Sequence, residues 1–295
     1  MIAADSAGAG DINCTLRVQT TARSVIVKQS RPWVAAQPAI AAAPDRTNVE
    51  RLFYETIQGV PSIAFRMPRL LASAPALYLL CLEDLGESMD YTELYSGRWL
   101  QANEIAELTS FLRDLHGFSL HASLGQFENR EMRELNYAGI FVSPLDDRNG
   151  VDLDGITPGL ASPASELRKD AVFRHAVEAV AVLYFSQGST LVHGDYFPKN
   201  WLSTPDGIKI IDPEFCFAGR AEYDWGVLLA HLYLSGQPEA LIDGLNVPGD
   251  CRIVRKFAGV EMLGRLLGIA QLPLRAGLED KIRMIRLCRS FVCSD

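Results

Sequence analysis

VHGDYFPKN spans residues 192–200, and IKIIDPEF follows at residues 208–215 after the turn TPDG. The apolar runs on either side of this turn predict two strands that it connects. Asp195 and Asn200 then lie on a loop between strands, and Asp212 lies at the end of an apolar strand, directly before a proline. The two stretches therefore bring two carboxylates and an amide close together.

These three side chains suit one type of chemistry. Transfer of the terminal phosphoryl group of ATP needs an acceptor or base at the nucleophilic hydroxyl and oxygen ligands for Mg²⁺. Mg²⁺ prefers a few carboxylate or amide oxygens and keeps water and phosphate in its other positions. Asp195 fits the first requirement, and Asn200 with Asp212 fits the second. Because a carboxylate of ordinary pKa is a weak base, we expect Asp195 to act mainly by aligning the hydroxyl.

The ordered pattern HGD-x4-N followed by IDPE resembles the aminoglycoside phosphotransferase and choline kinase superfamily, which shares the protein-kinase-like fold. The resemblance implies an α+β chain of two lobes, a small antiparallel β-sheet with one helix and a larger, mainly helical lobe. We place the ATP-binding lobe at residues 1–84 and the catalytic and substrate-binding lobe at residues 85–295. The resemblance also implies that His193 braces the catalytic loop and that Asp224 binds back to that loop.

The N-terminal part supplies the other residues that such a fold requires, namely a glycine-bearing turn, a strand lysine and a helix glutamate that orients the lysine. GAGDIN supplies Gly8 and Gly10, and SVIVKQ supplies Lys28. The next predicted helix supplies Glu50, which the resemblance favours. Glu55 lies on a different face of that helix, because five residues turn a helix by roughly 140°.

Residue patterns predict the remaining elements. Proline interrupts residues 31–44, so we expect an irregular loop there. Barely seven residues precede Gly8, so little chain remains for a first strand. Alternating or apolar runs predict strands over residues 14–20, 24–30 and two within 67–83. Helical spacing of apolar residues predicts helices over residues 45–58, 102–118, 165–188, 222–235, 250–270 and 278–292.

A narrower resemblance extends from residue 8 to about residue 270. GAGDINCTLRV, SVIVKQSRPWV, DRTNVE, CLEDL, IDPEFCFAG and GVEMLGRLLGIA are similar to segments of methylthioribose kinases. That resemblance implies a metal role for Asp212 and backbone contacts to adenine at Leu82 and Glu83. It also implies that Arg265 holds the acceptor sugar. Glu214 could bind a second Mg²⁺, bind a substrate hydroxyl or cap the next segment.

The chain departs from methylthioribose kinases at three places. Those kinases commonly have Ser at the position of Asn200, a Trp-containing loop after the lysine, and two arginines where this chain has Gly264 and Arg265. Aminoglycosides, choline and other amino alcohols therefore stay open as acceptors. The many cations of the last helices favour a neutral or anionic acceptor. A nucleotide-binding pseudokinase also stays open, whereas a protein kinase is disfavoured because no DFG or APE segment follows the loop.

The composition of the chain limits the classes of partner that we expect for it. The 295 residues carry a formal net charge of −8, which argues against nucleic-acid binding because a phosphate backbone needs a dominant basic face. The six cysteines follow no zinc or disulfide spacing, so we expect reduced thiols. With no signal-like N-terminus and no long apolar run, we expect a cytoplasmic protein that acts on a small molecule without a membrane partner. A homodimer stays open.

Overall fold

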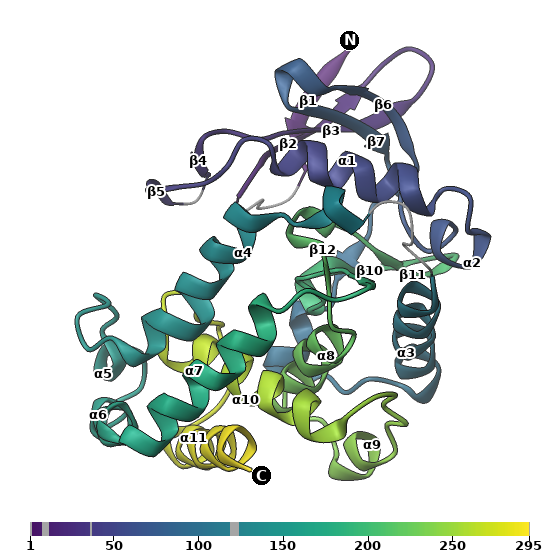
Figure 1. Cartoon of the computed structure of the whole chain (residues 1–295). Helices are drawn as coiled ribbons and strands as arrows, with labels where there is room; N and C mark the ends of the chain where they lie inside the picture. The colour runs from purple at the N-terminus through teal and green to yellow at the C-terminus, as the bar shows by residue number, and fades with distance from the viewer. Residues whose placement is uncertain (1, 8–11, 36, 119–123, 295) are drawn as a thin grey trace.

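The computed structural model describes residues 2–7, 12–35, 37–118 and 124–294. A β-sheet lobe near the N-terminus lies above a larger lobe of helices (Figure 1). The predicted α+β class with two lobes is confirmed. Within the part of the chain described here, no helix is both long and apolar enough to span a bilayer.

An antiparallel sheet forms the upper lobe, with strand order β1-β2-β3-β7-β6. Leu80 and Leu82 of β7 are buried at alternating positions, as expected for a strand with one face on a core. Little chain precedes Gly8, but four residues suffice for a first strand, because β1 pairs with β2. The strands are β1 Ala3–Ser6, β2 Cys14–Gln19, β3 Ser24–Gln29, β6 Leu70–Ala74 and β7 Leu79–Glu83.

The predicted irregular loop over residues 31–44 is wrong in part. This segment forms an antiparallel pair, β4 Trp33–Val34 and β5 Gln37–Ala41. Both strands of a two-stranded ribbon are edge strands, and an edge strand tolerates proline because one side of its backbone is unpaired. Pro38 can therefore lie within β5.

Helix α1, Arg46–Ile57, lies beneath the sheet and contacts β6, β7 and the turn Pro213–Phe215 (Figure 1). Phe53 and Ile57 are buried against the sheet and the lower lobe. A short helix, α2 Pro61–Ala64, and a 3-10 turn, Pro75–Leu77, follow in the described part of the upper lobe, and neither was predicted. Helix α1 thus joins the sheet to the IDPE segment.

Helices dominate the lower lobe, and α8 and α10 form its centre. Helix α8 has buried residues on all of its sides, among them Trp225, Leu228 and Leu232. The helices are α3 Ala102–Gly117, α4 Arg130–Tyr137, α5 Leu153–Ile156, α6 Ala161–Lys169, α7 Ala171–Phe185, α8 Glu222–Leu234, α9 Glu239–Asp243, α10 Cys251–Leu267 and α11 Leu278–Cys293.

The single helix predicted over residues 165–188 is wrong, because α6 and α7 are separate. Asp170 stands between them with extended backbone angles, and its side chain accepts a hydrogen bond from the Phe173 N–H at 3.1 Å. Aspartate at this position satisfies an otherwise unpaired N–H of the next helix, which favours a new start over a continued helix.

Short strands hold the segments that carry the candidate chemistry. A hairpin pairs β10 Trp201–Thr204 with β11 Gly207–Ile210, and β8 Met89–Asp90 pairs with β10. Strand β9, Thr190–Val192, pairs with β12, Phe217–Gly219. The predicted strand–turn–strand is confirmed. The division at residues 84/85 stays our proposal and falls between β7 and β8, which belong to different sheets.

Candidate active site

Asp224, the third residue of α8, fixes the loop that carries Asp195. Its fully buried carboxylate accepts hydrogen bonds from the backbone N–H groups of His193 at 2.8 Å and Gly194 at 3.0 Å. His116 Nε2 lies 2.9 Å from the same carboxylate. Charged acceptors form the stronger hydrogen bonds of a protein interior. The carboxylate of Asp224 therefore fixes the start of the loop.

His193 is a bracing residue in this geometry. Burial lowers the pKa of its imidazole, and the ring is completely covered. A neutral ring can donate from Nε2 to the Ile211 carbonyl at 3.0 Å and accept at Nδ1 from the Asp195 N–H at 3.3 Å. The ring thus connects the loop to the residue before Asp212.

Asn200 holds Asp195 from the other end of the loop. Its amide nitrogen donates to the Asp195 carbonyl oxygen at 2.8 Å and to the Asp195 carboxylate at 3.1 Å. Because the nitrogen is used in this way, the amide oxygen is the atom that Asn200 can offer to a cation.

The expectation that Asp195 keeps an ordinary pKa is wrong. Burial, together with the nearby carboxylates of Glu261, Asp212 and Glu214, raises the pKa of its carboxyl to about 7, although Arg265 opposes this. The side chain is still 22% exposed. A carboxylate with this pKa is a better proton acceptor near neutral pH than an ordinary one.

Arg265 faces Asp195 from α10. Its Nη2 lies 3.4 Å from Asp195 Oδ1, and its Nε donates to Glu261 at 2.7 Å. The guanidinium carbon lies 4.7 Å from the centre of the Phe197 ring. Burial alone would raise the pKa of Glu261, but Arg265 and His231 lower it to about 2. Arg265 is therefore held in one direction, toward the loop that carries Asp195.

The partners of Arg265 were missed by the sequence reasoning. His231 lies 3.2 Å from Glu261 and 2.7 Å from the Tyr95 hydroxyl. Glu261 precedes Arg265 by four residues, the spacing at which helical side chains meet, and this was the available signal. No comparable signal marked His231.

Lys28 joins the two lobes. It lies on β3 between β2 and β7, and its Nζ is 2.7 Å from Glu50 on α1 and bonded to Asp212. Burial alone would lower the pKa of Lys28, but Asp212, Glu50 and Glu214 raise it well above the usual value. Burial raises the pKa of Glu50 to about 8, although Lys28 opposes this. The predicted lysine and glutamate are thus brought together.

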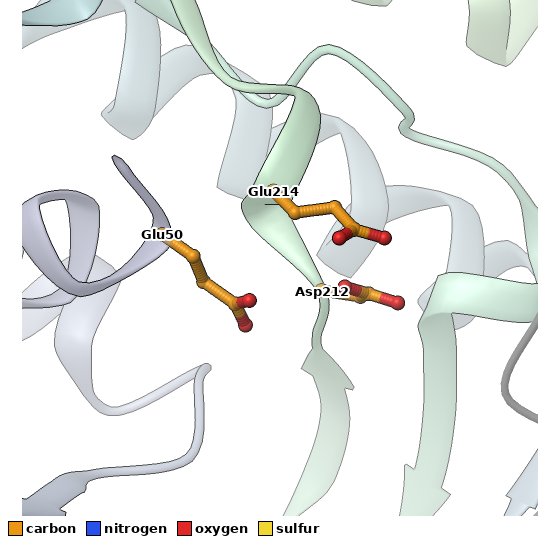
Figure 2. Close-up of side chains that lie close together, drawn as sticks. All are labelled: Glu50, Asp212 and Glu214. Atoms are coloured by element: carbon orange, nitrogen blue, oxygen red, sulfur yellow. The ribbon is translucent and has the colours of Figure 1, made fainter. Parts of the chain in front are cut away.

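Three carboxylates converge between the lobes, as Figure 2 shows for Glu50, Asp212 and Glu214. Each offers an oxygen within 4.8 Å of the others. Asp212 adopts a left-handed backbone with φ of 65°, which starts the turn that carries Glu214. Carboxylate oxygens at this spacing match the donors that Mg²⁺ prefers. The donor set therefore fits a magnesium site, with Asn200 as a neighbouring amide.

Glu214 is held by residues that the sequence reasoning did not select. Asn13 Nδ2 donates to Glu214 Oε2 at 2.6 Å, and Arg46 Nε lies 3.2 Å from the same oxygen. Burial and the neighbouring carboxylate of Asp212 together raise the pKa of Glu214 to about 7. Asn129 donates to the Glu214 and Cys216 carbonyl oxygens, both at 2.9 Å, which fixes the backbone of this turn.

The remaining predicted residues concern the nucleotide. Gly8 and Gly10 lie outside the described residues. Leu82 and Glu83 lie at the end of β7, where the Glu83 N–H donates to the Arg69 carbonyl oxygen at 2.9 Å. An adenine contact in this segment therefore has to use other backbone groups. All six cysteines are free thiols in the structure.

Comparison with known proteins gives consistent results. The curated relatives include methylthioribose kinases of Exiguobacterium sibiricum, 23% identical over 81% of this chain and 62% of that protein, and of Citrobacter koseri, 26% identical over 80% and 61%. The chain thus spans about three fifths of their length.

Solved structures share the fold at low identity. Choline kinase LicA from Streptococcus pneumoniae matches 98% of this chain and 94% of its own, with a TM-score of 0.54 and 13% identity. Spectinomycin phosphotransferase APH(9)-Ia matches 89% and 80%, with a TM-score of 0.51 and 15% identity. The model of the phosphotransferase enzyme family (APH) matches residues 6–252. The chain therefore belongs to the phosphotransferase enzyme family.

Proposed function

We propose that this protein is an ATP-dependent, Mg²⁺-requiring kinase that phosphorylates a hydroxyl group of a small metabolite. The observation that carries the proposal is the convergence of two sets of groups between the lobes. One set is the Asp195–Asn200 pair on the loop, and the other is Lys28 with the carboxylates of Glu50 and Asp212. Phosphoryl transfer needs both, because its catalysis is largely positioning and charge neutralisation.

Lys28 would hold the phosphates of the nucleotide. Glu50 fixes the lysine at 2.7 Å from a fully buried position, and such a buried pair restricts the ammonium group to one place. Asp212 and Asn200 would hold Mg²⁺, which neutralises phosphate charge when bound. Gly8, Gly10 and the backbone at Leu82 and Glu83 complete the proposed nucleotide site.

Asp195 would orient the acceptor hydroxyl and receive its proton. Asn200 and His193 fix the backbone and carboxylate of Asp195, so alignment is built into the loop. The raised pKa of Asp195, about 7, allows it to take up the proton as well as to align the hydroxyl.

Arg265 supports a neutral or anionic acceptor. Its guanidinium lies 3.4 Å from Asp195, so an acceptor hydroxyl bound at Asp195 would have a fixed cation beside it. A cationic acceptor such as an aminoglycoside or choline would be repelled there, whereas a sugar hydroxyl can accept hydrogen bonds from arginine. We therefore favour methylthioribose or a related sugar, and Glu214 is a further candidate for contact with metal or acceptor.

The test is a screen for ADP release from ATP and Mg²⁺ with methylthioribose, other pentoses, aminoglycosides, choline and homoserine. Asp212→Ala should abolish release, and Asp206→Asn on the exposed hairpin turn is the matched control that should not. Release with a sugar would support the proposal. Release with aminoglycosides alone would contradict the sugar preference, and nucleotide binding with no release for any acceptor would favour the pseudokinase.

A further inference from the structure

Two buried polar residues of the upper lobe, Asn13 and Arg46, have no role in the function proposed above. Asn13 ends the segment GAGDIN, and Arg46 is the first residue of α1. Asn13 is 5% exposed and Arg46 is 1% exposed. Burying polar and charged groups is unfavourable unless hydrogen bonds compensate for lost water. The partners of these side chains therefore indicate what they hold.

Arg46 ties three segments of the upper lobe together. Its guanidinium donates to the backbone carbonyl oxygens of Ile12 at 3.1 Å, Arg31 at 2.8 Å and Ala43 at 2.7 Å. Its Nε also donates to the side-chain oxygen of Asn13 at 2.9 Å. Because the guanidinium is planar and its donors have fixed directions, these bonds fix both Arg46 and Asn13.

Both residues also reach one oxygen of the lower lobe. Asn13 Nδ2 donates to Glu214 Oε2 at 2.6 Å, across 201 positions of sequence, and Arg46 Nε lies 3.2 Å from the same Oε2. These contacts do not use Oε1. Oε1 is therefore the oxygen that Glu214 can offer to the cluster with Glu50 and Asp212.

Asp212, the neighbouring carboxylate of the cluster, is met in a similar way by Lys28. Both acidic residues of the IDPE segment are thus contacted by cations of the upper lobe. Their mutual geometry depends on how the two lobes are placed, because neither cation belongs to the lower lobe. This interlobe dependence is a physical means of coupling.

We propose that Asn13 and Arg46 are positioning residues that orient Glu214 toward the divalent cation. This inference rests on the proposed function, because it takes the carboxylate cluster as the cation site. Asn13 is the last residue of GAGDIN, the segment that we propose to cover the phosphates. We expect binding of the nucleotide and binding of the cation to strengthen each other, and linkage requires this effect to be equal in both directions.

The competing explanation is that Asn13 and Arg46 only stabilise the folded upper lobe. The two explanations predict different cation affinities for variants of Asn13 and Arg46. Loss of a group that orients a metal ligand typically lowers metal affinity by roughly 10- to 100-fold. A residue with a packing role alone would change protein stability and leave cation affinity as it was.

The experiment measures Mn²⁺ binding to the full chain by electron paramagnetic resonance, with saturating ADP. Calorimetry measures ADP affinity without metal. The variants are Asn13→Ala, Asn13→Ser and Arg46→Lys, with circular dichroism to establish folding. Asn48→Ala is the matched control. Asn48 lies on α1, the helix of Arg46, and its amide donates to Asp45 at 2.7 Å and not to Glu214.

We expect Asn13→Ala to weaken Mn²⁺ binding by roughly tenfold while metal-free ADP affinity stays within twofold of the wild type. Asn13→Ser should behave similarly, and Asn48→Ala should match the wild type. Unchanged Mn²⁺ affinity in the folded Asn13 variants would overturn the inference and leave the proposed function intact. An equal loss of metal-free ADP affinity would also overturn it. A wild-type protein that binds no Mn²⁺ with ADP would overturn the proposed function itself.

Discussion

Replacing Asp224 by Asn tests how the catalytic loop is held. The Asp224 carboxylate accepts from the N–H groups of His193 and Gly194 with different oxygens, and His116 bonds the oxygen that faces His193. An Asn side chain has one oxygen, so at least one of these backbone N–H groups would face an NH₂ group. A hydrogen bond to a charged group contributes about 1.5–3 kcal/mol, and a buried donor without a partner is costly.

We therefore expect Asp224→Asn to lower the free energy of unfolding by about 3 kcal/mol. For a chain of this size the melting temperature would fall by roughly 6 °C. Urea unfolding followed by circular dichroism measures the change, and Asp206→Asn on the exposed turn should stay within about 0.5 kcal/mol of the wild type. A loss below about 1 kcal/mol for Asp224→Asn would refute the claim that this carboxylate holds the loop.

Three further predictions concern the loop and its surroundings. Gly194 has φ of +83°, and an added Cβ would collide with the Phe215 carbonyl oxygen, whereas Gly86 has φ of +78° in open space. Gly194→Ala should thus destabilise the protein by at least about 2 kcal/mol more than Gly86→Ala in urea unfolding, and equal losses would contradict the role of the contact. The pKa of Asp195 is raised to about 7, so the native state binds more protons than the unfolded state between about pH 4 and pH 7. The free energy of unfolding should therefore fall as pH rises through this window, and Asp195→Asn should flatten the decline; an equally steep decline in the variant would argue against the shift. Arg265→Met should reduce kcat/KM for the acceptor at least roughly tenfold with the KM for ATP unchanged, and a selective rise in the KM for ATP would place Arg265 on the nucleotide side.

The sequence allowed site residues to be predicted where they lie close together along the chain. The amide of Asn200 follows Asp195 of HGD by five residues, and a short hairpin then leads to IDPE. Because the hairpin returns the chain to its starting point, the proximity of these groups could be predicted. Glu50 could be selected over Glu55 because the stretch DRTNVE is similar to a segment of methylthioribose kinases. The two-lobed α+β architecture followed from the same motifs and from the change from strand to helix periodicity.

Contacts between distant segments could not be predicted in this way. Asn13 and Glu214 are 201 positions apart, and only the folded chain places the amide on the carboxylate. No sequence pattern marked Arg46, which can be buried because backbone carbonyl oxygens accept hydrogen bonds from its guanidinium. The raised pKa of Asp195 is likewise a consequence of burial, which one sequence does not specify.

Local competition explains the errors in secondary structure. Asp170 can cap a helix as well as extend one, and periodicity alone does not decide between these outcomes. Pro38 suggested a loop, but in a ribbon of two edge strands a proline costs no ladder bond on its open side. In both cases a neighbouring segment decides the structure: α7, whose N–H Asp170 binds, and β4, which pairs with β5.

The most direct test of the account compares the wild type with Asp195→Asn, with the best acceptor from the screen. ADP release measures turnover, and calorimetry measures binding of ATP with Mg²⁺. We expect the variant to bind the nucleotide with wild-type affinity and its turnover to fall by at least about a thousandfold, because the hydroxyl loses its aligned proton acceptor. Turnover within about tenfold of the wild type would contradict the central claim that Asp195 performs the transfer chemistry.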